Sequence, residues 1–388
     1  MRLLDKDILA CRIDSSVKCD LAENKICGAA LYVGQAGETV YKKSFGSADP
    51  IKNIPVTDKT LFRIASMTKP VTAVAALQLV DRGLLSLDDP VAKFLPAFRN
   101  MRIAAINDQG KLVDAGPAQN PVTIKHILTH TSGIGSGNVG GLQIGAMTAE
   151  NLATLENTIA YFSEQGLQFE PFTKRVYSGF PSFDVLTGVI EKVADEDFQD
   201  YITREIFAPC NMTDTTFTPS EEQWERLVTM HNRVDGKSCT AKMNDGCVFE
   251  NIPCTHYLGG AGLVSTLYDY INFAEMLLHN GNFDGRQIVS AESVKKMSTP
   301  QIPRELNPGI SSWGLSVRVI VEEERHNLPI GAYGWSGHYG PHFWVDPKNQ
   351  IVAIYMKNSL YDPGSNPLTG VNFEADVYHS FQCECWKP

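Results

Sequence analysis

A serine and a lysine three residues apart, followed by a long apolar run, constrain this chain more than any other feature. Ser66 and Lys69 precede residues 70–82, which read PVTAVAALQLVDR, and Gly83 follows. The run is nearly apolar all round, so we predict a buried helix over 70–82 that ends at the glycine. Free backbone N–H groups and the helix dipole favour a developing negative charge on a serine at that N-terminus. Lys69, one turn further along the same face, can take the proton of the Ser66 hydroxyl and return it to a leaving group.

Two other serine–lysine pairs have the same spacing. Ser15 and Lys18 are followed by polar, charged chain, and Ser293 and Lys296 stand in the short, partly charged segment AESVKKM. Neither pair opens a buried helix, and a pair of this kind is by itself usually a solvated helix turn. The sequence therefore favours Ser66 as the reactive serine.

Length and charge limit the classes of protein. The 388 residues are enough for two hydrophobic cores, and 43% hydrophobic with 20% charged residues is typical of a folded chain. A net charge of −10 without any Lys/Arg-rich run excludes nucleic acid and an anionic membrane as expected partners. No apolar run is long enough to cross a membrane.

We expect a cytoplasmic protein. The first twenty residues carry charges throughout and lack the apolar core and cleavage site of a secretory signal. The nine cysteines are odd in number and irregular in spacing, which fits reduced thiols better than a disulfide framework. No metal site and no particular oligomeric state are predicted.

Strand-like and helical segments alternate in blocks along the chain. We expect strands within 26–47, 311–321, 331–346 and 350–358, helices at 122–134, 148–165, 181–195, 197–207, 267–280 and near the C-terminus, and polar loops at 101–120 and 221–256. Strands at both ends with helices between them predict two domains. Residues 1–95 and 257–388 would form a sheet domain, and residues 96–256 a mostly helical domain with long loops.

Tyr177 is a second candidate for proton transfer. Tyr177, Ser178 and Gly179 stand just before an expected helix whose Pro181 suits a first turn. A tyrosine is a poor base by itself, but beside a protonated lysine its phenolate is favoured, so the two together can activate a serine. The alternative is a half-buried tyrosine that caps the helix. The residues alone leave both readings open.

The segment Trp335-Ser336-Gly337-His338 falls within an expected strand. An edge strand beside the reactive serine can donate a backbone N–H to an oxyanion, and the N–H of Ser66 itself would be the second donor. Gly337 would let a substrate approach the backbone. Alternatively, Trp335 belongs to the core and Gly337 marks a bulge.

Other catalytic patterns are missing from the sequence. There is no G-x-S-x-G, which counts against an α/β-hydrolase, and no H-E-x-x-H, Walker loop or G-x-G-x-x-G. His126 and His130 stand four apart, as helix-borne metal ligands do, but lack a carboxylate partner. We therefore interpret both histidines as structural.

Five segments together resemble the class C β-lactamase-like serine hydrolases, which share the S-x-x-K arrangement with penicillin-binding proteins. In order they read FRIASMTKP at 62–70, ILTHTSGI at 127–134, VYSG at 176–179, GGAGLVST at 259–266 and YGWSGHYGPHFWVDP at 333–347. The resemblance runs from about residue 28 to about residue 360 and is greatest to the family VIII carboxylesterases. It implies an α+β fold, with an antiparallel sheet flanked by helices, a mostly helical domain, and the site at their junction.

The resemblance also implies roles for particular residues. Ser66 would be the nucleophile, Lys69 and Tyr177 its activating pair, and the N–H groups of Ser66 and His338 the oxyanion hole. The turn at His130 would be structural. No metal or organic cofactor is implied.

Two positions depart from the β-lactamase pattern. Class C β-lactamases and related peptidases carry Lys or His where this chain has Trp335, so a cation for the substrate carboxylate is lost. The β-lactamases carry Asn two residues after the tyrosine, where this chain has Gly179, so an amide for the acylamido group is lost. Trp335, Ser336, Gly337 and Gly179 are the candidate substrate-binding residues.

These observations predict a serine hydrolase that acts through an acyl-enzyme on small carboxylic esters. One alternative is an amidase, a D-aminopeptidase or a penicillin-binding-protein-like peptidase with weak β-lactamase activity. Another is acyl transfer to an alcohol in place of water. A catalytically silent binding module is the third, and the three intact residues Ser66, Lys69 and Tyr177 argue against it.

Overall fold

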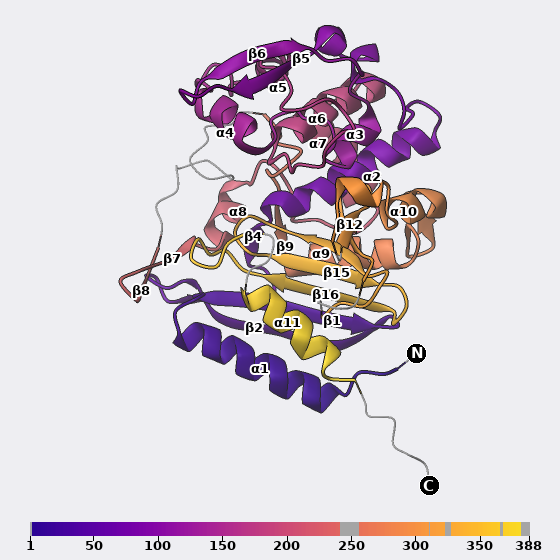
Figure 1. Ribbon diagram of the computed structural model, residues 1–388. Coiled ribbons are helices and arrows are strands. Elements are labelled where there is room, and N and C mark those ends of the chain that lie inside the picture. Colours follow the sequence, from indigo (N-terminus) through magenta and orange to yellow (C-terminus); the bar gives the residue numbers. More distant parts are fainter. Residues whose placement is uncertain (1, 241–255, 310, 323–326, 365–367, 382–388) are drawn as a thin grey trace.

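An eight-stranded antiparallel sheet forms the centre of the protein in the computed structural model (Figure 1). The structure describes residues 2–240, 256–309, 311–322, 327–364 and 368–381. The strand order is β12-β13-β14-β15-β16-β1-β2-β3, so the two ends of the chain build one sheet. The strands are β1 Gly28–Gln35, β2 Glu38–Asp49, β3 Ile54–Pro55, β12 Ser311–Trp313, β13 Arg318–Ile320, β14 Tyr333–Ser336, β15 His342–Asp346 and β16 Ile351–Met356.

Strand β16 shows why this sheet is covered on both faces. Its six residues, IVAIYM, are all buried. Val352, Ile354 and Met356 belong to one hydrophobic cluster, and the alternate residues Ile351, Ala353 and Tyr355 belong to another. Since successive side chains of a strand point to opposite faces, an apolar run without alternation requires a layer on each side.

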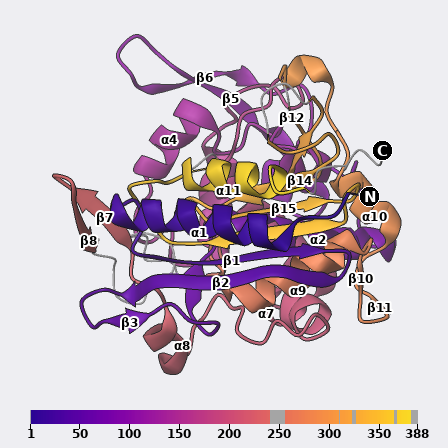
Figure 2. The same ribbon diagram turned by 90° about the horizontal axis from the view of Figure 1, so that it is seen from below.

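Different helices supply the two layers. On one face α1 (Lys6–Ala22) and α11 (Leu368–Tyr378) lie side by side, as Figures 1 and 2 show, and bury residues such as Leu9 and Phe373 against the sheet. On the other face lie α9 (Leu267–Leu278) and, beyond it, α2 (Thr68–Asp81). The predicted helix at 70–82 is therefore confirmed as α2, and Gly83 follows it with a φ of +70°.

A mostly helical layer covers α2 on the side away from the sheet (Figure 1). It contains α3 Ile124–Leu128, α4 Gly137–Gly145, α5 Leu155–Glu164, α6 Pro181–Ala194 and α7 Phe198–Ile202, with the hairpin of β5 Arg102–Ile106 and β6 Leu112–Pro117. The remaining elements are α8 Glu221–Arg226, α10 Ala291–Met297 and the strand pairs β4 Leu61–Arg63 with β9 Val264–Thr266, β7 His231–Val234 with β8 Lys237–Thr240, and β10 Asn282–Phe283 with β11 Arg286–Gln287.

Several sequence-based boundaries were wrong. The expected strand 331–346 is two strands, β14 and β15, joined by a turn in which the N–H of Gly337 donates to the carbonyl of Pro341 at 2.8 Å. The expected strand 311–321 is likewise the hairpin β12–β13, and the expected loop 101–120 is the hairpin β5–β6. Gly337 and His338 therefore lie just after the strand in which they were expected.

The middle of the chain also reaches the sheet layer. Thr229 donates its N–H to the carbonyl of Ala48 at 2.8 Å, and His231 donates to that of Asn358 at 3.0 Å. This segment was expected in the helical domain, but it packs beside strands β2 and β16. The part of the expected loop at 241–255 lies outside the described residues. The domain division at residues 95 and 256 stays a prediction.

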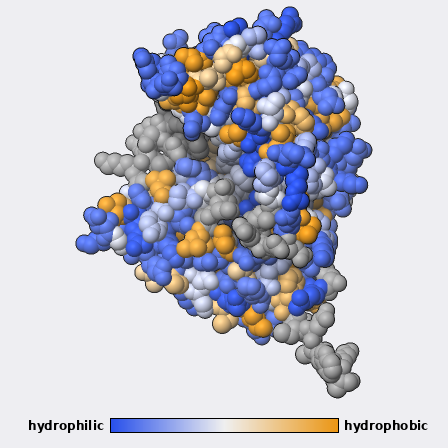
Figure 3. Space-filling model, viewed as in Figure 1, coloured by the Kyte–Doolittle hydropathy of each residue, from blue (hydrophilic) through white to orange (hydrophobic). Residues whose placement is uncertain are grey.

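Polar residues dominate the surface in the view of Figure 3, with scattered hydrophobic residues over both layers. In the described part of the chain, no helix has both the length and the apolar character needed to cross a membrane.

Candidate active site

Ser66 lies in a short 3-10 turn, residues Ala65–Met67, that leads directly into α2. Strand β4 carries the chain into this turn and pairs with β9. Ala65 is buried and has a φ of +44°, a left-handed conformation that is strained for a residue with a side chain. The hydroxyl of Tyr270 donates to the carbonyl of Met67 at 2.9 Å and holds the turn from below. The serine is thus fixed on a strained, well-supported turn.

Ser66 is more accessible to solvent than the residues around it. Of residues 61–70, it alone is partly exposed, and Lys69 is fully buried. The Nζ atom of Lys69 donates to Ser66 Oγ at 3.2 Å, to the carbonyl of Gly260 at 2.7 Å, and to the carbonyl of Gly179. The sequence-predicted serine and lysine are therefore in contact, with the reactive oxygen on the accessible side.

The surroundings of Lys69 change its proton affinity. Among the described residues its Nζ has no carboxylate as a hydrogen-bond acceptor, and burial lowers the pKa of this lysine. The nearby Tyr177 and, more weakly, the carboxyl of Asp184 oppose that shift in the pKa of Lys69. Burial also raises the pKa of Asp184, so this carboxyl is a poor counter-ion. A lysine in such a place releases its proton more readily than one in water, as a base requires.

Tyr177 completes the group that the sequence predicted. Lys69 Nζ lies 5.0 Å from the centroid of its ring. The indole Nε1–H of Trp335 donates to the Tyr177 hydroxyl oxygen at 3.3 Å, and the two rings lie 5.4 Å apart. Ser66, Lys69, Tyr177 and Trp335, from three separate segments, therefore meet at one place between the sheet and the helical layer.

His130 supports Tyr177 from the other side. Its ring centroid lies 4.4 Å from that of Tyr177, and its Nδ1 accepts the backbone N–H of Ser178 at 3.3 Å. Burial, and then the charges of Lys69 and Arg175, lower the pKa of His130 well below its usual range. A neutral imidazole that accepts from a backbone N–H fits the structural role expected for this turn, and its contact with the Tyr177 ring was not expected.

The side chains of Trp335 and Ser336 lie on opposite faces of the sheet. Trp335 faces the site and is 8% exposed. The side chain of Ser336 points to the opposite face, where its Oγ lies 2.8 Å from His342 Nδ1, and His342 Nε2 lies 3.0 Å from Glu374 Oε1. Because alternate residues of a strand face opposite ways, only the backbone of Ser336 is offered to a substrate.

Gly337 and His338 form the turn after β14. A Cβ atom on Gly337 would lie 2.4 Å from the carbonyl oxygen of Ile64, so only glycine allows this turn to approach the segment that carries Ser66. His338 is exposed, and its carbonyl accepts the N–H of Gly364 at 2.8 Å. The turn therefore lies against the serine turn, as the predicted oxyanion hole requires, and the role of the His338 N–H stays a prediction.

Gly179 lies two residues beyond Tyr177 and is exposed. A Cβ atom built on it would meet no atom of the described residues within 4 Å. There is thus space for a longer side chain here. The position lacks a side-chain amide because its residue is glycine, and not because neighbouring atoms would exclude one.

The two other serine–lysine pairs do not form such a contact. Ser15 Oγ donates to the carbonyl of Cys11 at 2.7 Å, and Lys18 pairs with Asp14 at 3.6 Å. Lys296 pairs with Glu292 at 2.7 Å. Ser293 is buried and donates to Asp81 at 2.7 Å. Neither arrangement offers an activated hydroxyl.

The chain is similar to known proteins along most of its length. The Beta-lactamase family matches residues 13–372. Esterase EstB of Burkholderia gladioli is 29% identical over 395 residues, 94% of each chain. The lovastatin esterase of Penicillium rubens is 30% identical over 406 residues, 97% of this chain and 99% of that protein.

Solved structures agree on the fold. EstCE1, described as a hydrolase with promiscuous acyltransferase activity, superposes with a TM-score of 0.80 over 96% of this chain and 99% of its own, at 22% identity. The expected α+β fold is confirmed. The family match spans most of the sequence, and the chain belongs to the β-lactamase family of serine hydrolases.

Proposed function

We propose that this protein hydrolyses small carboxylic esters through an acyl-enzyme on Ser66. The contact between Lys69 Nζ and Ser66 Oγ at 3.2 Å, made by a fully buried lysine whose pKa is lowered, carries the proposal. Esters are also the substrates named for two relatives, an esterase and a lovastatin esterase. We place the activity in the cytoplasm, as the sequence predicts.

The reaction begins when Ser66 Oγ attacks the ester carbonyl. Lys69 and Tyr177 take the hydroxyl proton as a pair and return it to the departing alcohol. The N–H groups of Ser66 and His338 stabilise the tetrahedral oxyanion. Water, activated by the same pair, then attacks the acyl-enzyme, releases the acid and restores Ser66.

Trp335 explains the preference for an ester over a β-lactam. It supplies an apolar wall and an N–H that is already donated to Tyr177, at the position where a β-lactamase offers a cation. A carboxylate buried against the indole would lose its hydration without gaining a partner.

The test compares p-nitrophenyl butyrate with benzylpenicillin and a D-alanyl p-nitroanilide at pH 8. We expect the neutral ester to give by far the highest kcat/KM. Turnover of benzylpenicillin or of the anilide at a rate equal to that of the ester would contradict the assignment. Ser66→Ala is the blank, and Ser293→Ala is the matched control that keeps full activity.

A further inference from the structure

Arg175 is a partly buried cation beside the site that the proposed chemistry does not use. It precedes Tyr177 by two residues. Its guanidinium carbon lies 5.3 Å from the ring centroid of Trp313. The Trp313 ring in turn lies 4.6 Å from that of Trp335 and 6.3 Å from that of Tyr177. The arginine therefore stands beside a cluster of three mutually close aromatic rings, one of which is the catalytic tyrosine.

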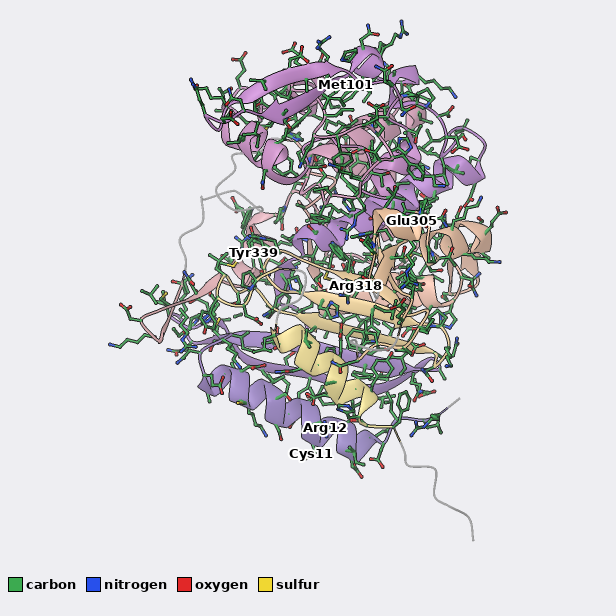
Figure 4. The ribbon with its side chains drawn as sticks, in the orientation of Figure 1. Cys11, Arg12, Met101, Glu305, Arg318 and Tyr339 are labelled. Carbon is green, nitrogen blue, oxygen red and sulfur yellow. The ribbon has the colours of Figure 1, made fainter. Side chains whose placement is uncertain are left out.

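The guanidinium is held in one orientation by a neutral amide. Nε and Nη2 of Arg175 donate to Oδ1 of Asn307 at 2.9 and 2.6 Å, and the Asn307 amide donates to the carbonyl of Ser311 at 2.6 Å. Glu305, two residues before Asn307, is labelled in Figure 4 and lies near the boundary between the sheet and the helical layer. The asparagine fixes the arginine without neutralising it.

No carboxylate pairs with Arg175 within the part of the chain that the structure describes. Two other shielded arginines do have one: Arg318 pairs with Glu374 at 3.4 Å, and Arg226 pairs with Asp214. Burial lowers the pKa of Arg175, which reflects the cost of keeping a charge there without an anion. A ligand that brings an anion would offset that cost.

The geometry also leaves donors for such a ligand. An arginine has five N–H groups, and Asn307 accepts from only two of the nitrogens. Nη1 of Arg175 donates to no atom of the described residues and is not buried, so its N–H groups are accessible to a ligand. A planar, pre-oriented guanidinium with free N–H groups matches a carboxylate, which it can bind through two parallel hydrogen bonds.

We infer that Arg175 binds a carboxylate on the substrate, so that the preferred esters carry an acid group several bonds away from the reacting carbonyl. The inference rests on the proposed function and names its substrate class. In this inference a cation beside Trp313 takes the place of the one lost at Trp335, and its different position suits a longer, flexible acid and not the fixed carboxylate of a β-lactam.

Matched ester pairs test this inference on both sides of the scissile bond. For the acyl side we compare mono-p-nitrophenyl adipate with p-nitrophenyl hexanoate, and for the alcohol side 3-acetoxybenzoate with its methyl ester. The variants are Arg175→Gln and Arg175→Lys, and Lys174→Gln is the control because it removes an exposed charge one residue away.

In at least one pair, Arg175→Gln should lower kcat/KM for the acid ester about tenfold or more, as expected for the loss of a charge-assisted contact. It should change kcat/KM for the neutral ester of that pair by no more than about threefold. Arg175→Lys should retain part of the preference, and Lys174→Gln all of it. The inference is overturned if Arg175→Gln leaves the ratio of kcat/KM for the acid to kcat/KM for the neutral ester unchanged in both pairs. It is also overturned if the parent enzyme hydrolyses the neutral esters and neither of the acids.

A binding measurement separates this inference from the proposed function. If no ester is hydrolysed, the proposed function fails, and calorimetric titration of adipate into Ser66→Ala then decides about Arg175. Adipate that binds Ser66→Ala at least tenfold more tightly than Ser66→Ala with Arg175→Gln supports the carboxylate site. Equal binding, or none, overturns it.

Discussion

Replacement of Trp335 by phenylalanine tests how Tyr177 takes part in proton transfer. The substitution removes the indole N–H that donates to the Tyr177 oxygen at 3.3 Å and keeps an aromatic ring 5.4 Å from that of the tyrosine. A hydrogen bond to this oxygen is stronger when the oxygen has lost its proton. The variant should therefore hold the shared proton of the Lys69–Tyr177 pair more tightly.

The size of the effect follows from the geometry. A hydrogen bond to a charged group contributes about 1.5–3 kcal/mol, and at 3.3 Å the lower end applies. About 1.5 kcal/mol corresponds to about one pH unit. Because burial lowers the pKa of Lys69, the basic form of the pair is reached below the ordinary range of a lysine, and kcat/KM rises with pH as the proton leaves.

The assay is kcat/KM for p-nitrophenyl butyrate from pH 5 to 9. We expect Trp335→Phe to move the midpoint of the rising limb upward by about one unit. Trp313→Phe is the matched control, because Trp313 lies in the same aromatic cluster and the hydrogen bond to Tyr177 comes from Trp335. If the midpoint of the rising limb does not move, or moves equally in both variants, the reasoning is refuted.

Three further outcomes are expected. Lys69→Ala and Tyr177→Phe should each lower the rate of ester hydrolysis by about 10² to 10⁴, and the double variant by little more than the worse single one, whereas multiplied losses would show that the two do not act together. Gly179→Asn, which has room for its side chain, should raise acylation by benzylpenicillin relative to butyrate hydrolysis, and an unchanged ratio would deny the role of this position. His342→Phe removes a partner from Ser336 and from Glu374 and should lower the free energy of unfolding in urea by about 1–3 kcal/mol; a loss under about 0.5 kcal/mol would mean that this buried contact contributes little.

Local patterns predicted helix α2 and the contact between Ser66 and Lys69. The apolar run after Ser66 indicated α2, and the spacing to Lys69 indicated the contact that the structure shows. Both depend on residues that are close together in the sequence. By contrast, α1 was not predicted, although Asp5 caps it by accepting the N–H groups of Asp7 and Ile8 at 3.1 and 3.0 Å. The buried positions of α1 are spaced four apart, which is a helical pattern, but the many charged residues between them obscured it.

Contacts between distant segments could not be predicted from spacing. Arg175 and Trp313 lie in different layers of the fold, and no local pattern joins them. The same holds for the network of Ser336, His342 and Glu374, whose last member is on the C-terminal helix. The network extends to Arg318, which Figure 4 labels on the sheet. Ser336 was expected at the substrate because its neighbours are there, but the alternation of the strand turns its side chain away.

The identity of the nucleophile is tested most directly by intact-mass spectrometry after brief exposure to a serine-directed p-nitrophenyl phosphonate, followed by peptide mapping. We expect one adduct per chain, on the peptide that contains Ser66, and none in Ser66→Ala. Labelling should be unchanged in Ser15→Ala and Ser293→Ala. An adduct on a peptide that contains Ser15 or Ser293, or full labelling of Ser66→Ala, would contradict it.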